Sequence, residues 1–213
     1  MTTDIDYMKT NFQYQVLTKI TGKPNYTLLK KIKDKLMANA ASVTSNAGGG
    51  MHGHLGQVLN PVDYTVVSLV PYIKPTHPGP LVIPPGTPNY QQQELQENHK
   101  EAVTVAREAD NVDRTLKKQL VGALPDLYLL CFQNRLTNTF THPLHVMIDY
   151  LFATYGRVET EELQAAKEKL EAKVFDIQQP LILLYNAVED LQILASAAQQ
   201  PFMALQTVDL GVK

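Results

Sequence analysis

Residues 94–123, ELQENHKEAVTVAREADNVDRTLKKQLVGA, determine the fold class that we expect. The first half, Glu94 to Ala109, consists mostly of strong helix formers. The second half, Asn111 to Ala123, repeats apolar residues at the spacing of one helix face. These residues are Val112, Leu116, Leu120 and Ala123. The pattern predicts two consecutive amphipathic helices, so the chain is expected to be all-α.

Helix signals continue on both sides of this stretch. Upstream, apolar residues recur at helical spacing between residues 25 and 41. Downstream, prolines suit the first turns of helices over residues 125–133, 144–155 and 181–198, because the missing N–H is not needed there. Gly156 is expected to end its helix as a left-handed cap. Thr160 is expected to cap the following helical turn.

Two expectations concern buried side chains in the C-terminal half. Residues 181–198 should bury one stripe, formed by Leu181, Leu184, Tyr185, Val188, Leu191 and Leu194. Cys131 is the only cysteine, which rules out an intrachain disulfide. It stands between Leu130 and Phe132, so we expect it in the core.

Residues 36–93 contrast with these helices because their only formal charges are Asp63 and Lys74. Residues 66–88 also hold seven of the thirteen prolines, so they cannot continue a helix or a central strand. Their apolar side chains are too many for a solvated linker. We therefore expect an extended arm packed on its own domain or on a neighbouring chain. This gives three parts, namely an N-terminal part (1–93) and two helical domains (94–157 and 158–213).

A glycine cluster precedes the arm, formed by Gly48, Gly49, Gly50, Gly53 and Gly56. It is no phosphate-binding P-loop, because no Gly-Lys-Ser/Thr follows it. It is no dinucleotide fingerprint either, because a helix and not a strand precedes it. Glycines after a helix commonly terminate it and permit positive φ. The cluster is therefore interpreted as a backbone joint that lets the arm reach a partner.

His52 and His54 have the spacing of some two-histidine metal sites, and His77 is a possible third ligand. No carboxylate lies between residues 35 and 62, so a zinc site would depend on the arm folding back. A metal enzyme on these histidines remains an alternative. The chain lacks hydrolase, zincin and paired-carboxylate signatures. We expect no enzymatic activity and no cofactor.

Charge is distributed unevenly, although the formal net charge is only −2. Residues 1–35 hold seven lysines against three acids, and residues 94–213 hold seventeen acids against eleven lysines and arginines. A nucleic-acid-binding patch on the first helix is therefore a second alternative. It would use Lys30, Lys31, Lys33 and Lys35, together with Lys19 and Lys23. No signal peptide or membrane-spanning run is recognisable, so a cytoplasmic protein that contacts no membrane is expected.

The order of several motifs resembles the Gag polyprotein of copia-type (Ty1/copia) LTR retrotransposons. The motifs are residues 111–120, the loop Ala123-Leu124-Pro125, residues 127–129, the helix closing on Leu151 to Gly156, and residues 175–191. The upstream half resembles the leader of Gag-like proteins in algal and other protist genomes. This second resemblance rests on residues 17–24, 45–50, 53–56 and 78–86. Together the two resemblances span about residues 15 to 205.

The resemblance implies a non-enzymatic capsid protein with two small helical domains that self-associates into a shell around the element's RNA. The chain has no zinc knuckle, and it stops where more helix is expected. A host-adopted Gag remnant is therefore a further alternative. We expect the arm to pack on a neighbouring copy through Leu69, Val70, Tyr72, Ile73, Leu81, Val82 and Ile83. In the second domain, the expected helix face consists of Leu184, Tyr185, Val188 and Leu191.

Overall fold

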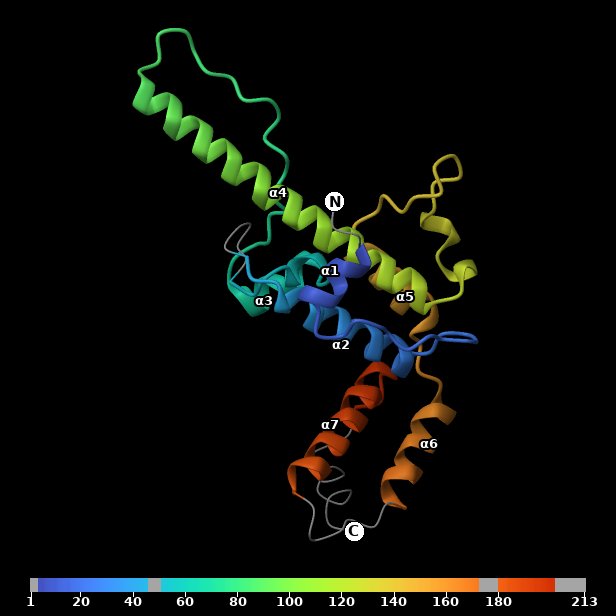
Figure 1. The fold of residues 1–213 in the computed structure, drawn as a ribbon. Helices are drawn as coiled ribbons and strands as arrows, with labels where there is room; N and C mark the ends of the chain where they lie inside the picture. The colour runs from blue at the N-terminus through green and yellow to red at the C-terminus, as the bar shows by residue number, and fades with distance from the viewer. Residues whose placement is uncertain (1–3, 46–50, 173–179, 202–213) are drawn as a thin grey trace. The chain divides into compact units, whose positions relative to one another are not determined.

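The computed structural model describes residues 4–45, 51–172 and 180–201. Within these ranges the chain is all-α, as predicted, with seven α-helices and no strand (Figure 1). Gln133 and Phe140 form one isolated antiparallel bridge. The chain divides into two compact units. One comprises Met1–Gly22 and Lys30–Tyr150, and the other comprises Lys23–Leu29 and Leu151–Lys213. No helix of the described ranges is long and apolar enough to cross a bilayer.

The first unit is built on α2 and on α4 (Asn89–Ala123), and each of these two helices buries one face. α2 spans Tyr26–Ser42, close to the predicted bounds. It begins where the Asn25 side chain accepts a hydrogen bond from the Leu28 backbone N–H at 3.0 Å, which is a local capping signal. The buried residues of α2 within this unit are Ile32, Leu36, Asn39 and Ala40. α1, Asp4–Asn11, packs on α4.

α4 is a single helix, Asn89–Ala123, and the prediction of two helices was wrong. No proline or glycine interrupts residues 94–121. The Asp110 side chain pairs with Lys74, and the Asn111 side-chain oxygen accepts from Arg114 at 3.0 Å, so neither side chain competes with the helix backbone. All eight buried residues of α4 lie from Ala106 onward. Its N-terminal half therefore projects beyond the core of the unit.

α3, Pro61–Ser68, places Val66 and Val67 in a helix, where an extended arm was predicted. Two local signals explain this start. Pro61 occupies the first turn, and the Asn60 side chain accepts a hydrogen bond from the Asp63 N–H at 2.9 Å. The residues that follow, up to the start of α4, form no helix or strand. We call residues 69–88 the arm, which runs along the N-terminal half of α4 in Figure 1.

Between α4 and α5 the structure departs from the prediction. Residues 125–133 form two short 3-10 turns, η2 (Asp126–Tyr128) and η3 (Leu130–Phe132). Leu129, which lies between the two turns, is the only buried residue of 125–133, so no continuous apolar face supports a longer helix. Cys131 is exposed, and its expected core position was wrong for the same reason.

α5 spans Leu144–Tyr155, as predicted, but Gly156 does not end it in a left-handed conformation. The glycine N–H donates to the Phe152 carbonyl at 2.9 Å. A Cβ on this glycine would lie 2.6 Å from the same oxygen. Close backbone approach, and not positive φ, explains the glycine.

The second unit contains α6, Thr160–Glu171, and α7, Ile182–Ala197. Their shared core consists of Leu163, Leu191, Leu194 and Ala195. Glu159 and not Thr160 is the N-cap of α6, and it makes no side-chain capping bond. The expected α7 stripe is therefore only partly right. Val188, Leu191 and Leu194 are buried and Leu184 is half-buried, but Leu181 and Tyr185 are exposed because the core reaches only the C-terminal half of α7.

Candidate functional site

Apolar side chains are exposed along one side of α3 and at the start of the arm. Val62, Val66 and Leu69 follow one another at helical spacing and are 73%, 74% and 85% exposed. Val70 and Ile73 continue this exposure into the arm. We call these five residues the α3–arm surface. Clustered exposed apolar residues commonly mark protein-binding sites.

The opposite side of α3 is buried. Tyr64 is fully buried in a cluster with Leu55 and Leu59, against which Tyr72 also packs. The Ser68 hydroxyl donates to the Tyr64 carbonyl at 2.9 Å. α3 is therefore held with a fixed orientation, and this orientation keeps Val62 and Val66 exposed.

The arm residues predicted to contact a neighbouring copy divide into two groups. Leu69, Val70, Ile73, Leu81 and Val82 are exposed, and Ile83 is half-buried. Tyr72 instead packs on its own chain, where its ring lies 5.5 Å from that of Tyr64 in an edge-on arrangement. The arm therefore has an apolar side available to a partner and a base anchored by Tyr72.

Gly56 explains how Tyr72 fits. A Cβ on this glycine would lie 2.2 Å from Cγ of the Tyr72 ring, so any other residue would displace the ring. Gly53 has φ +60, and a Cβ there would meet the Val43 carbonyl oxygen at 2.4 Å. These two glycines of the predicted joint are thus required by close packing and by backbone conformation. Gly48, Gly49 and Gly50 lie outside the described residues.

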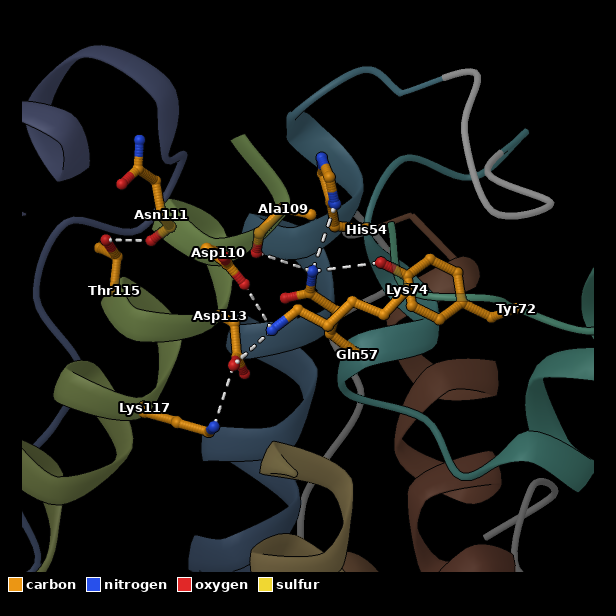
Figure 2. Close-up of polar contacts among 10 residues, drawn as sticks. All are labelled: His54, Gln57, Tyr72, Lys74, Ala109, Asp110, Asn111, Asp113, Thr115 and Lys117. Carbon is orange, nitrogen blue, oxygen red and sulfur yellow. Dashed lines mark hydrogen bonds and ion pairs between the residues drawn. The ribbon is translucent and has the colours of Figure 1, made fainter. Parts of the chain in front are cut away.

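A polar cluster holds the base of the arm, as Figure 2 shows. The Lys74 ammonium lies 2.9 Å from Asp110 Oδ1 and 3.0 Å from Asp113 Oδ2. Lys117 also pairs with Asp113, at 2.9 Å. Burial alone would lower the pKa of Lys74, but the hydrogen bonds to Asp110 and Asp113 outweigh it and raise that pKa. Lys74 is therefore a charged anchor between the arm and α4.

Gln57 connects this anchor to the body of the unit. Its amide nitrogen donates to the Tyr72 hydroxyl at 3.1 Å and to the Ala109 carbonyl at 3.0 Å. The same nitrogen lies 3.4 Å from Nδ1 of His54, which is only 1% exposed. The Gln57 carbonyl oxygen and His54 Nε2 are buried without a hydrogen-bond partner. Burial, and secondarily the charge of Lys74, lowers the pKa of His54.

The outer part of the arm makes fewer contacts. His99 on α4 bonds through Nε2 to the Gly79 carbonyl at 2.8 Å, so this nitrogen must be the donor. The Gly79 N–H donates to His77 Nδ1 at 3.0 Å. His77 is therefore engaged with its own loop. The three histidines of the metal alternative differ in setting, since His52 is half-buried, His54 is buried and His77 is exposed.

Within the described ranges, no group of three or more histidine, cysteine or acidic side chains is placed to hold a metal ion. The lysines of α2 are dispersed around the helix. Lys30 pairs with Asp34 at 2.9 Å, and Lys35 lies 5.7 Å from the Tyr14 ring centroid. Lys31 is exposed and Lys33 is half-buried. The 100° step between residues places Lys33 and Lys35 on opposite edges of the buried face.

Sequence reasoning missed the polar cluster, although one signal for it was visible. Asp113 and Lys117 have the i,i+4 spacing of a helical ion pair. Lys74 is the only basic residue between positions 36 and 93, where Asp63 is the only other charged residue, and this could have suggested a specific partner. Nothing local in the sequence identifies Asp110 as a partner of Lys74 or places Gln57 in the same cluster.

Comparison with known proteins adds no relative. A scan against protein-family models, a search of curated proteins and a search of solved structures each found no match.

Proposed function

We propose that this chain is a Gag-like structural protein whose copies assemble into a capsid-like shell, with the α3–arm surface as one of the contacts between copies. The observation that carries the proposal is the exposed apolar side of α3, formed by Val62, Val66 and Leu69. Burial of apolar area is the main favourable term in association, at about 25 cal/mol per Å². The resemblance of the motif order to copia-type Gag gives the kind of assembly.

The charge of this region favours a second copy over a nucleic acid as the partner. Lys74 is the only basic residue between positions 36 and 93, and two aspartates already pair with it. Phosphate binding requires several lysines or arginines. An uncharged apolar surface can instead meet its own copy across a twofold axis without repulsion between like charges.

The test is the assembly state of the purified full chain. We expect oligomers or particles of the wild-type protein by light scattering and negative-stain microscopy. Val62→Asp combined with Val66→Asp places two carboxylates on the α3–arm surface and should abolish assembly. Ala165→Asp, at an exposed position of α6, is the matched control and should assemble as the wild type does.

Two results would contradict the proposal. A wild-type chain that stays monomeric at every concentration measured would exclude self-assembly. Assembly of the double aspartate variant at the wild-type level, with its helical circular dichroism intact, would exclude the α3–arm surface as a contact between copies.

A further inference from the structure

We propose that the arm exchanges between two copies, so that Lys74 of one copy pairs with Asp110 and Asp113 of the other. The inference rests on the proposed self-assembly and specifies one of its contacts. It is drawn from three features of the arm, namely its anchor, its hinge and its exposed outer side.

The anchor is specific and small. Tyr72 enters the space left by the missing side chain of Gly56, and Lys74 pairs with two aspartates on α4. The receiving residues, Gly56, Asp110 and Asp113, lie outside the arm, in what we call the body of the unit. The inserted residues, Tyr72 and Lys74, belong to the arm. A second copy presents the same receiving residues in the same arrangement, so its body can accept the arm equally well.

The hinge is strained. Leu69, the residue that joins α3 to the arm, has φ 61 and ψ 1, a left-handed conformation that branched side chains disfavour. Its side chain is 85% exposed, so packing of that side chain does not offset the strain. In an exchanged arrangement the hinge can extend, which removes the strain. Short hinge segments under strain favour exchange of the attached element between copies.

The arm is also prepared to leave its own body. Its prolines restrict the released segment to extended conformations, so little conformational entropy is lost when it docks again. Beyond Lys74, the side-chain hydrogen bonds from α4 to the arm are those from His99 to the Gly79 carbonyl at 2.8 Å and from Gln92 to the Thr87 carbonyl at 2.7 Å. Val82, in the outer part of the arm, is 77% exposed. Elements with few buried contacts are the ones that open locally.

The decisive experiment separates pairing within a chain from pairing between chains. In the K74E variant, the new carboxylate faces Asp110 and Asp113 of its own chain. In the D110K/D113N variant, the new lysine faces Lys74 of its own chain, and the amide that replaces the Asp113 carboxylate can still accept a hydrogen bond from Lys117. Each chain alone therefore loses the attraction at its own anchor and has like charges there instead. When the two variants are mixed, arm exchange brings the new carboxylate of one chain to the new lysine of the other.

We expect each variant alone to lose at least tenfold in apparent association constant and the equimolar mixture to recover it as a one-to-one heterodimer. Native mass spectrometry of the two variants, which differ in mass, identifies this species. Circular dichroism and thermal unfolding of each variant confirm that the body is folded. No recovery on mixing, with wild type assembling, would overturn the exchange and leave the proposed function intact. A monomeric wild type would overturn the proposed function, whatever the mixture does.

A second pair of variants tests the hinge. Leu69→Gly and Leu69→Ala remove the same exposed side chain, but only glycine relieves the left-handed strain. We expect the exchanged fraction to fall severalfold further in L69G than in L69A. Equal exchanged fractions in the two variants would exclude hinge strain as a driving force for exchange.

Discussion

Two buried polar clusters of the first unit fix neighbouring segments of the chain, and they differ in completeness. In one, the fully buried Asn39 accepts from the Tyr14 N–H at 2.7 Å and donates to the Tyr14 carbonyl at 2.8 Å and to Gln119 at 2.9 Å. In the other, Gln57 and His54 each leave one buried atom without a partner. A complete network rigidifies a core, whereas an incomplete one leaves desolvated groups uncompensated.

We expect this difference to separate a permanent attachment from a releasable one. The complete cluster attaches the segment around Tyr14 to α2 and α4. This segment lies far from the α3–arm surface in sequence. The incomplete cluster attaches the arm, whose release the proposed arm exchange requires. Four predictions test this contrast, in order of decreasing expected effect.

The largest effect is expected for Asn39→Leu. The substitution leaves the part-buried Tyr14 N–H and the buried Gln119 oxygen without their present partner, and an unsatisfied buried group costs about 1–3 kcal/mol. We expect the free energy of unfolding, measured by urea titration, to fall by about 3 kcal/mol.

Gln57→Leu is the comparison for that variant and should cost only about 1 kcal/mol. The Ala109 carbonyl it leaves lies within α4 and can still accept from the helix backbone. Tyr72 is half-buried. The variant also loses the 3.4 Å contact to His54 Nδ1, but it removes the unpartnered Gln57 carbonyl oxygen, which offsets that loss. Equal losses in Asn39→Leu and Gln57→Leu would contradict the contrast between the clusters.

Gly56→Ala is expected to release the base of the arm. The new Cβ would overlap the Tyr72 ring, and overpacking of this kind costs about 1–3 kcal/mol. Hydrogen exchange of residues 72–74 should accelerate while that of α2 and of the second half of α4 stays slow. Gly122→Ala is the control, because nothing lies within 4 Å of its Cβ position and it should stabilise α4 by up to about 1 kcal/mol. Unchanged exchange at residues 72–74 in the Gly56 variant would refute the packing argument.

Local signals explain what could be predicted from the sequence. The starts of α2, α5 and α7 follow from Asn25, Pro143 and Pro180, each of which acts on its own helix within a turn. The absence of helix and strand from residues 69–88 followed from their proline content. These features are decided by a few neighbouring residues, so a single sequence is sufficient to indicate them.

Several errors concern contacts with distant residues, whereas the missed start of α3 and the wrong caps at Gly156 and Thr160 are local. The continuity of α4 through Asp110 is supported by Lys74, which lies far away in the sequence. Tyr72 and Leu81 have similar apolar character, but only Tyr72 meets a glycine that makes room for it. Tyr185 fits the helical spacing of the α7 stripe, yet the core described for that unit does not reach its position. No local pattern distinguishes these cases.

His54 should make the unfolding free energy depend on pH. Its pKa is lowered in the folded state, so the unfolded chain binds more protons below the ordinary histidine value of about 6.5. The stability is therefore fully present above about pH 6.5 and is lost as the pH falls toward the depressed value. The slope is at most about 1.4 kcal/mol per pH unit for this one proton.

Urea titrations at a series of pH values on both sides of the ordinary histidine pKa measure this dependence. His54→Asn should flatten it, whereas His52→Asn, at the half-buried histidine two positions earlier, should retain it. A dependence that is equal in both variants would assign the proton to another group.

The smallest effect concerns the two aspartates that hold Lys74. Asp113 is 17% exposed and pairs with two lysines, whereas Asp110 is 63% exposed and pairs with Lys74. Exposed ion pairs contribute about 0–1 kcal/mol and are screened by salt, while less exposed pairs are screened less. Asp110→Asn should therefore change the unfolding free energy by under about 0.5 kcal/mol, and Asp113→Asn by more. Urea titrations at low and at high salt measure both changes. If Asp110→Asn lowers the unfolding free energy more than Asp113→Asn does at both salt concentrations, the arm is held mainly by the exposed Asp110. In that case the incomplete cluster of Gln57 and His54 does not determine whether the arm can be released.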